Sequence, residues 1–167
     1  MRFCNLNMNI QIEPAYGYPS EVKALFTEYT DMLIANDPKF KKYLDLQNYD
    51  EELKHLENKY GMPQGRLYLL RCDGAVAGCI ALRRADEHHG ELKRLYIKPA
   101  YRGKGLGRLL AERIIADAKQ IGYRHVILDT LPFLESAIGM YKKMGFYEVA
   151  PFNNSPMDHS IYMKLDL

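Results

Sequence analysis

Residues 95–110 of the chain read LYIKPAYRGKGLGRLL and join an expected strand to an expected helix. Pro99 stops the strand, and the loop that follows carries glycine at every second position, at Gly103, Gly105 and Gly107. The first N–H groups of a helix have no partner within the helix, and the helix dipole adds partial positive charge there. This loop therefore predicts an anion site, for which phosphate is the best-suited ligand.

The spacing in this loop separates it from two well-known nucleotide loops. A Walker loop needs Gly-Lys-Ser/Thr, but Lys104 is followed by Gly105. The fingerprint Gly-x-Gly-x-x-Gly would place its third glycine at Arg108 or Leu110, and neither is glycine. Asp129 does lie about where that fingerprint places an acid, so a dinucleotide site stays open as an alternative. From the spacing alone, a turn without any ligand also stays open.

Periodicity predicts the elements on both sides of the loop. Strands are expected at 8–13, 66–71, 76–82, 91–98, 124–129, 146–149 and 161–165, and helices at 20–35, 50–60, 105–121 and 133–144. Asp73-Gly74 is a hairpin turn signal, and Gly78 suggests a bulge. The strand–loop–helix–strand unit over 91–129 predicts two parallel neighbouring strands with a right-handed crossover. We expect one α/β domain over residues 1–167, with a mixed central sheet of six to seven strands flanked by about four helices.

Composition and charge exclude several classes of protein. A formal net charge of only +2 argues against a nucleic-acid partner, and no apolar run approaches the ~20 residues of a membrane span. The segment 1–4 turns polar at Asn5, so we expect no secretory signal. Cys4, Cys72 and Cys79 form no pairing pattern, which favours a reducing, cytoplasmic setting. The histidines show no zinc-type spacing, so no metal is expected.

Two motifs together resemble the signatures of the GNAT family of acyl-CoA-dependent N-acetyltransferases. Arg102, Gly105 and Gly107 match the family's Arg/Gln-x-x-Gly-x-Gly/Ala pattern after a strand. Tyr141, followed by Gly145-Phe146, looks like the second signature, in the expected order and at a usual separation. The resemblance is strong over about 91–149 and implies the acyl-CoA N-acyltransferase-like fold, with acetyl-CoA as cosubstrate.

The resemblance also implies how acetyl-CoA is bound. Backbone amides from Gly103 to Gly107 would hold the pyrophosphate, and the backbone of residues 95–97 would pair with the pantetheine arm like an added strand. The implied cosubstrate-binding residues are Leu95, Tyr96, Ile97, Arg102, Gly103, Lys104, Gly105, Leu106, Gly107 and Arg108.

Acetyl transfer to an amine needs a base and a weak acid. A lysine-like amine with a pKa of ~10.4 is neutral in only about one molecule in a few thousand at pH 7, so a base or a desolvating site must help. Glu91 is the candidate base, because it stands where the histone-acetylating branch of the family has its glutamate; it is expected to share a face with Lys93, Leu95 and Ile97. Alternatively, Glu91 is a strand-end carboxylate paired with Lys93 or Arg94.

Tyr141 is the candidate acid for the departing thiolate. By periodicity alone it is equally a core tyrosine, and only the resemblance assigns it a role near the sulfur.

The acceptor is expected between residues 29–60 and 151–162, which are rich in Tyr, Asp and Asn. A small polar amine or amino acid and a protein or peptide amine both stay open. The family often forms dimers, so we expect a homodimer. The alternative function is a non-catalytic CoA-binding regulatory module.

Overall fold

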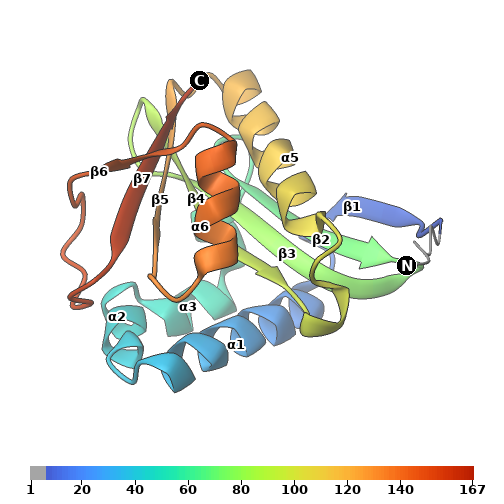
Figure 1. The fold of residues 1–167 in the computed structure, drawn as a ribbon. Coiled ribbons are helices and arrows are strands. Elements are labelled where there is room, and N and C mark those ends of the chain that lie inside the picture. The colour runs from blue at the N-terminus through green and yellow to red at the C-terminus, as the bar shows by residue number, and fades with distance from the viewer. Residues whose placement is uncertain (1–6) are drawn as a thin grey trace, which may run out of the picture.

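A seven-stranded mixed sheet forms the centre of the computed structural model, which describes residues 7–167 (Figure 1). Its order is β1-β2-β3-β4-β5-β7-β6, in which only β4 and β5 run parallel. The strands are β1 (Ile10–Pro14), β2 (Arg66–Cys72), β3 (Ala75–Arg84), β4 (His89–Ile97), β5 (His125–Thr130), β6 (Tyr147–Val149) and β7 (Ile161–Asp166). The predictions made for the segment 1–4, including Cys4, lie outside the described residues.

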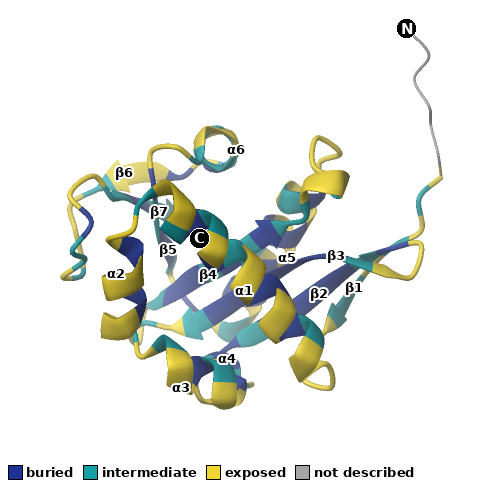
Figure 2. Cartoon of the chain, turned by 90° about the horizontal axis from the view of Figure 1, so that it is seen from below, coloured by how far each residue is buried: buried dark blue, intermediate teal, exposed yellow. Residues whose placement is uncertain are grey.

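Six helices cover the two faces of this sheet (Figures 1 and 2). They are α1 (Pro19–Asn36), α2 (Phe40–Leu46), α3 (Tyr49–Lys54), α4 (Leu56–Tyr60), α5 (Leu106–Ile121) and α6 (Glu135–Lys143). Helix α5 buries the apolar line Leu106, Leu110, Ile114 and Ala118 against one face, as its period of about 3.6 residues predicts. Helices α1 and α4 pack on the opposite face against alternate residues of β2. The predicted mixed α/β fold is confirmed.

The region between α1 and β2 differs from the prediction. Helix α2 was not expected, and the single helix expected over 50–60 is broken at His55, whose φ of −137° and ψ of 66° are not helical. A seven-residue helix has little stability of its own. Helix α2 instead depends on the burial of Phe40, Tyr43 and Leu44 in a cluster with Leu131, a contact distant in sequence that periodicity cannot reveal.

The expected bulge near Gly78 is present, one residue away. Leu70 pairs with Gly78 and Arg71 with Val76, so Ala77 is the extra residue. Gly78 itself is required by a close approach, because a Cβ there would lie 2.6 Å from the carbonyl oxygen of Tyr96.

A second bulge, not predicted, lies in β4. Cys79 pairs with Tyr96 and Ala81 with Lys93, so that Arg94 and the residue after it oppose a single residue of β3. Arg94 adopts a φ of 58°, which is uncommon for a residue other than glycine.

The bulge in β4 changes which side chains share a face. Leu92, Leu95 and Ile97 all pack into the core beneath α5. Lys93 instead donates to Gln47, on the side of the sheet where α2 lies. The prediction that Glu91, Lys93, Leu95 and Ile97 share one face is therefore wrong, since strict alternation fails across a bulge.

A buried ion pair holds the bulge in place. The guanidinium of Arg94 donates to both carboxylate oxygens of Glu52, at 2.9 and 3.0 Å, and lies over the ring of Tyr49. Lys59 adds a third contact to Glu52 at 2.9 Å. Burial alone would raise the pKa of Glu52, but the charges of Arg94 and Lys59 outweigh it and lower that pKa to about 2.

None of the helices within residues 7–167 has the length and apolar character needed to cross a membrane. Cys72 and Cys79 are buried free thiols, and burial raises the pKa of both.

Replacing Glu52 with Gln should lower the free energy of unfolding by about 3–5 kcal/mol at pH 7, because it leaves Arg94 buried without a counter-charge. The stabilisation that ionised Glu52 gives to the folded state is complete above its unfolded-state pKa near 4.5 and is lost as the pH falls toward 2. Urea unfolding between pH 2 and pH 7 should therefore show wild type and variant converging at the acid end.

The control is Glu51→Gln, which removes an exposed pair with Lys54 and should cost under about 0.5 kcal/mol. Equal stability of wild type and Glu52→Gln at pH 7 would contradict the assigned role of the pair.

Candidate active site

The parallel strands β4 and β5 pair over three residues and then part. His89, Gly90 and Glu91 pair with 125–127, and no pairing joins the two strands beyond Glu91 within the described chain. Strand β4 continues beside β3, and β5 continues beside β7 up to Thr130. The sheet therefore opens into a V between β4 and β5. The bulge in β4 falls within the diverging part, and bulges increase local twist.

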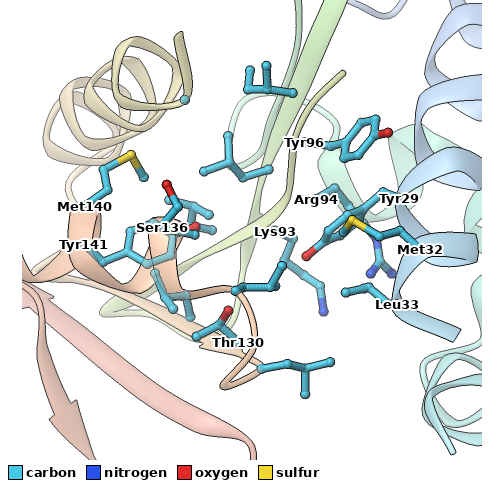
Figure 3. Close-up of a pocket in the computed structure, with 18 of the residues that line it drawn as sticks. Tyr29, Met32, Leu33, Lys93, Arg94, Tyr96, Thr130, Ser136, Met140 and Tyr141 are labelled. Atoms are coloured by element: carbon cyan, nitrogen blue, oxygen red, sulfur yellow. The ribbon is translucent and has the colours of Figure 1, made fainter. Parts of the chain in front are cut away.

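A pocket of about 560 Å³ occupies this opening (Figure 3). Helix α1 supplies one wall through Tyr29 and Met32, and α6 supplies the facing wall through Met140 and Tyr141. Lys93 extends between these walls from β4 (Figure 3). Every predicted site residue except Glu91 and Lys104 lines the pocket.

The glycine loop forms the end of the pocket at the start of α5. Gly103 and Gly105 adopt φ values of 76° and 75°, in the left-handed region that favours glycine. Gly105 is the N-cap of α5, and no side chain among the described residues caps this helix end. The N–H groups of its first turn are therefore left for a ligand, as expected for an anion site.

The basic side chains near the loop are held in different ways. Arg102 donates to the carbonyl oxygen of Ile97 at 2.9 Å and lies over the ring of Tyr96. Arg108 pairs with Glu112 at 2.8 Å while still lining the pocket. Lys104 is exposed, lies 5.8 Å from the centroid of the Tyr101 ring and is not among the residues that line the pocket.

Tyr141 lies on the pocket wall and is only 4% exposed. Its ring packs against Phe146, and within residues 7–167 its hydroxyl makes no hydrogen bond to protein. Burial raises the pKa of Tyr141 well above its usual value, and the charge of Tyr29 acts in the same direction. The hydroxyl therefore stays protonated at neutral pH and can donate a proton or a hydrogen bond into the pocket.

Glu91 lies outside the pocket and is 3% exposed. Arg83 holds its carboxylate at 2.7 Å, and Lys93 lies at 3.6 Å from it. Of the two partners that the sequence suggested, Lys93 is thus near Glu91, whereas Arg94 is committed to Glu52.

A polar cluster that the sequence did not assemble closes the other end of the pocket. Asp129, at the end of β5, accepts hydrogen bonds from the hydroxyl of Tyr43 and from the side-chain amide of Asn153. The hydroxyl of Tyr162 donates to the side-chain oxygen Oδ1 of Asn153 at 2.8 Å. The position of Asp129 at a strand end was the available signal, since ligands bind beyond the carboxyl ends of strands in open α/β sheets. Tyr43 reaches it only because the unexpected helix α2 forms.

These features define a class of protein. An uncapped helix N-terminus at a glycine loop, a sheet that opens beside it and a buried tyrosine in one pocket are the features that the resemblance implies for an acyl-CoA-binding transferase. Within residues 7–167, no group of three or more His, Cys, Asp or Glu side chains is placed to hold a metal ion.

Comparison with known proteins gives the family. Residues 24–146 match the profile of the acetyltransferase (GNAT) family. An uncharacterised N-acetyltransferase of Schizosaccharomyces pombe is 37% identical over 126 residues, which cover 74% of this chain and 77% of the relative. The chain therefore belongs to the GNAT family and is an N-acetyltransferase.

Solved structures share the fold at lower identity. PaiA N-acetyltransferase of Thermoplasma acidophilum, in complex with coenzyme A, superposes with a TM-score of 0.71 at 18% identity, covering 96% of this chain and 100% of that one. A GNAT family acetyltransferase of Elizabethkingia anophelis with acetyl-CoA bound gives 0.64 at 22% identity, covering 95% and 99%.

Replacing Gly105 with Ala should lower the free energy of unfolding by about 1–2 kcal/mol, because alanine is strained at this positive φ. Gly139, within helix α6, is the matched control. Apart from its chain neighbours and the backbone of its own helix, no atom lies within 4 Å of an added Cβ, and Gly139→Ala should stabilise by about 0.5–1 kcal/mol. Urea denaturation measures both, and a Gly105→Ala protein as stable as wild type would contradict the left-handed loop.

Proposed function

We propose that this chain transfers the acetyl group of acetyl-CoA to a primary amine by direct attack through a tetrahedral intermediate. The observation that carries the proposal is that one continuous pocket joins the glycine loop, Tyr141 and Asp129. A single cosubstrate lying in the opening between β4 and β5 would thus present its thioester to both an acid and an acceptor end.

Main-chain groups would do most of the cosubstrate binding. The amides of residues 103–107 would hold the pyrophosphate at the start of α5, with the charges of Arg102, Arg108 and Lys104 nearby. The edge of β4 that has left β5, at residues 95–97, would pair with the pantetheine arm as an added strand. The two similar structures, one in complex with coenzyme A and one with acetyl-CoA bound, support acetyl-CoA as the cosubstrate.

The chemistry needs few groups. The neutral amine attacks the thioester carbon, and a backbone donor on the free edge of β4 stabilises the oxyanion that forms. The C–S bond then breaks, and Tyr141 gives its proton to the departing sulfur. The thiolate is a good leaving group, with a free pKa near ~8.5, so a weak acid such as a tyrosine hydroxyl is sufficient.

The proton of the incoming ammonium must also be removed. Glu91, the predicted base, does not line the pocket and is held by Arg83, so it could accept this proton only through a relay. Asp129 lines the pocket directly.

The homodimer and the cytoplasmic setting stay predictions from the sequence.

The proposed transfer is tested by the release of free thiol from acetyl-CoA in the presence of a panel of primary amines. We expect amine-dependent release, with the acetylated amine detected by mass spectrometry. Saturable CoA binding without thiol release from any amine would contradict transfer and would favour the regulatory module.

Tyr141→Phe should lower kcat by about ten- to a hundred-fold, since it removes the acid for the leaving thiolate. The Kd for CoA should stay within about twofold, because the hydroxyl does not contribute to pyrophosphate binding. Tyr147→Phe, an exposed position on β6, is the control and should leave kcat unchanged. An unaltered kcat in Tyr141→Phe would contradict the role of Tyr141 as the acid and would leave it as a core residue.

A further inference from the structure

Lys93 brings a positive charge into the pocket that its neighbours only partly neutralise. Its side chain is 9% exposed, and its ammonium group donates to the neutral oxygen Oε1 of Gln47 at 2.9 Å. Its nearest carboxylate, Glu91, is 3.6 Å away and already binds Arg83 at 2.7 Å. Burial lowers the pKa of Lys93, as expected for an ammonium whose charge is incompletely matched.

Gln47 has its orientation fixed by two cations. Its Oε1 accepts from Lys93 at 2.9 Å and from Arg94 at 3.1 Å, so this atom must be the carbonyl oxygen and the other must be the NH₂ group. Among the described residues, that NH₂ group has no hydrogen-bond acceptor, and Gln47 lines the pocket. Lys93 and Gln47 together therefore offer N–H donors to an anion.

Asp129 brings the opposite charge to the same pocket. Both of its hydrogen-bond donors, Tyr43 and Asn153, are neutral. Within residues 7–167, no lysine, arginine or histidine lies within 4.0 Å of its carboxylate. This contrasts with the neighbouring pair of Arg94 and Glu52, whose charges satisfy each other.

We propose that the acceptor is a small amine that carries a carboxylate, as amino acids do. The carboxylate would bind Lys93 and Gln47, and the amine would bind Asp129. Opposite charges that share a pocket without touching suit a ligand that carries both, because a buried unmatched charge is costly. One lysine matches the single charge of a carboxylate better than the roughly double charge of a phosphate monoester.

The proton transfers balance with Asp129 as a catalytic residue. Its carboxylate takes one proton from the ammonium group, and the neutral amine forms the C–N bond of the tetrahedral intermediate, from which the C–S bond then breaks. Tyr141 protonates the sulfur, and the second proton lost by nitrogen restores the tyrosine through solvent. Asp129 then releases its proton to solvent, so one amide, one free thiol and one proton result. This inference rests on the proposed acetyl transfer.

Wild-type protein tests the substrate class through matched pairs of free amino acids and their carboxamides. The carboxamide has nearly the size of the acid but lacks its negative charge. Its amine is also less basic and is more often neutral, which by itself would make the carboxamide react faster than the acid. We expect kcat/KM at least about tenfold higher for the acids. Thiol release at equal or higher rates from the amides would overturn this inference alone. No release from any amine would overturn the proposed transfer as well.

Two variants assign the roles. Lys93→Met keeps an apolar stem of similar length and should raise KM for the acids by about tenfold or more, with little effect on kcat or on the amides. Asp129→Asn should lower kcat by about a hundred-fold for both, with CoA affinity retained. Lys98→Met is the control, because Lys98 pairs with Glu28 and does not line the pocket. An equal loss of kcat/KM for acids and amides in Lys93→Met would contradict the carboxylate site.

Discussion

The site depends on one constraint, that β4 and β5 stop pairing after three residues. Each strand keeps its other neighbour, so the sheet does not come apart but opens between them. Backbone that would otherwise complete a sheet then faces a pocket. A sheet that remained closed would leave the glycine loop on the surface with no room beside it for an extended ligand.

The charges on either side of this opening serve different purposes. Arg94, Glu52 and Lys59 form a buried group whose charges are matched, and it fixes the bulge that turns β4. Lys93 and Asp129, by contrast, line the pocket: the nearest carboxylate to Lys93 is shared with Arg83, and the hydrogen-bond donors to Asp129 are neutral. The first set stabilises the shape of the site, and we infer that the second selects the acceptor.

Much of this arrangement could be predicted from the sequence. All seven strands lie within two residues of their expected bounds, because alternation, turn residues and prolines are local signals. The glycine loop and Tyr141 lie in one pocket, as the two motifs indicated. Helix α2 and the bulge at Arg94 were missed, because both depend on contacts distant in sequence, with Leu131 and with Glu52. Without the bulge, Lys93 was predicted to share a face with Leu95 and Ile97, and without α2 nothing in the sequence brought Tyr43 to Asp129.

Amide hydrogen exchange with and without saturating coenzyme A tests most directly whether the opening between β4 and β5 binds the cosubstrate. The account predicts slower exchange at residues 95–97 and 103–109, with no change in β1 or α3. Unchanged exchange in both of these segments at a coenzyme A concentration that saturates binding would contradict it, because the ligand would then lie elsewhere.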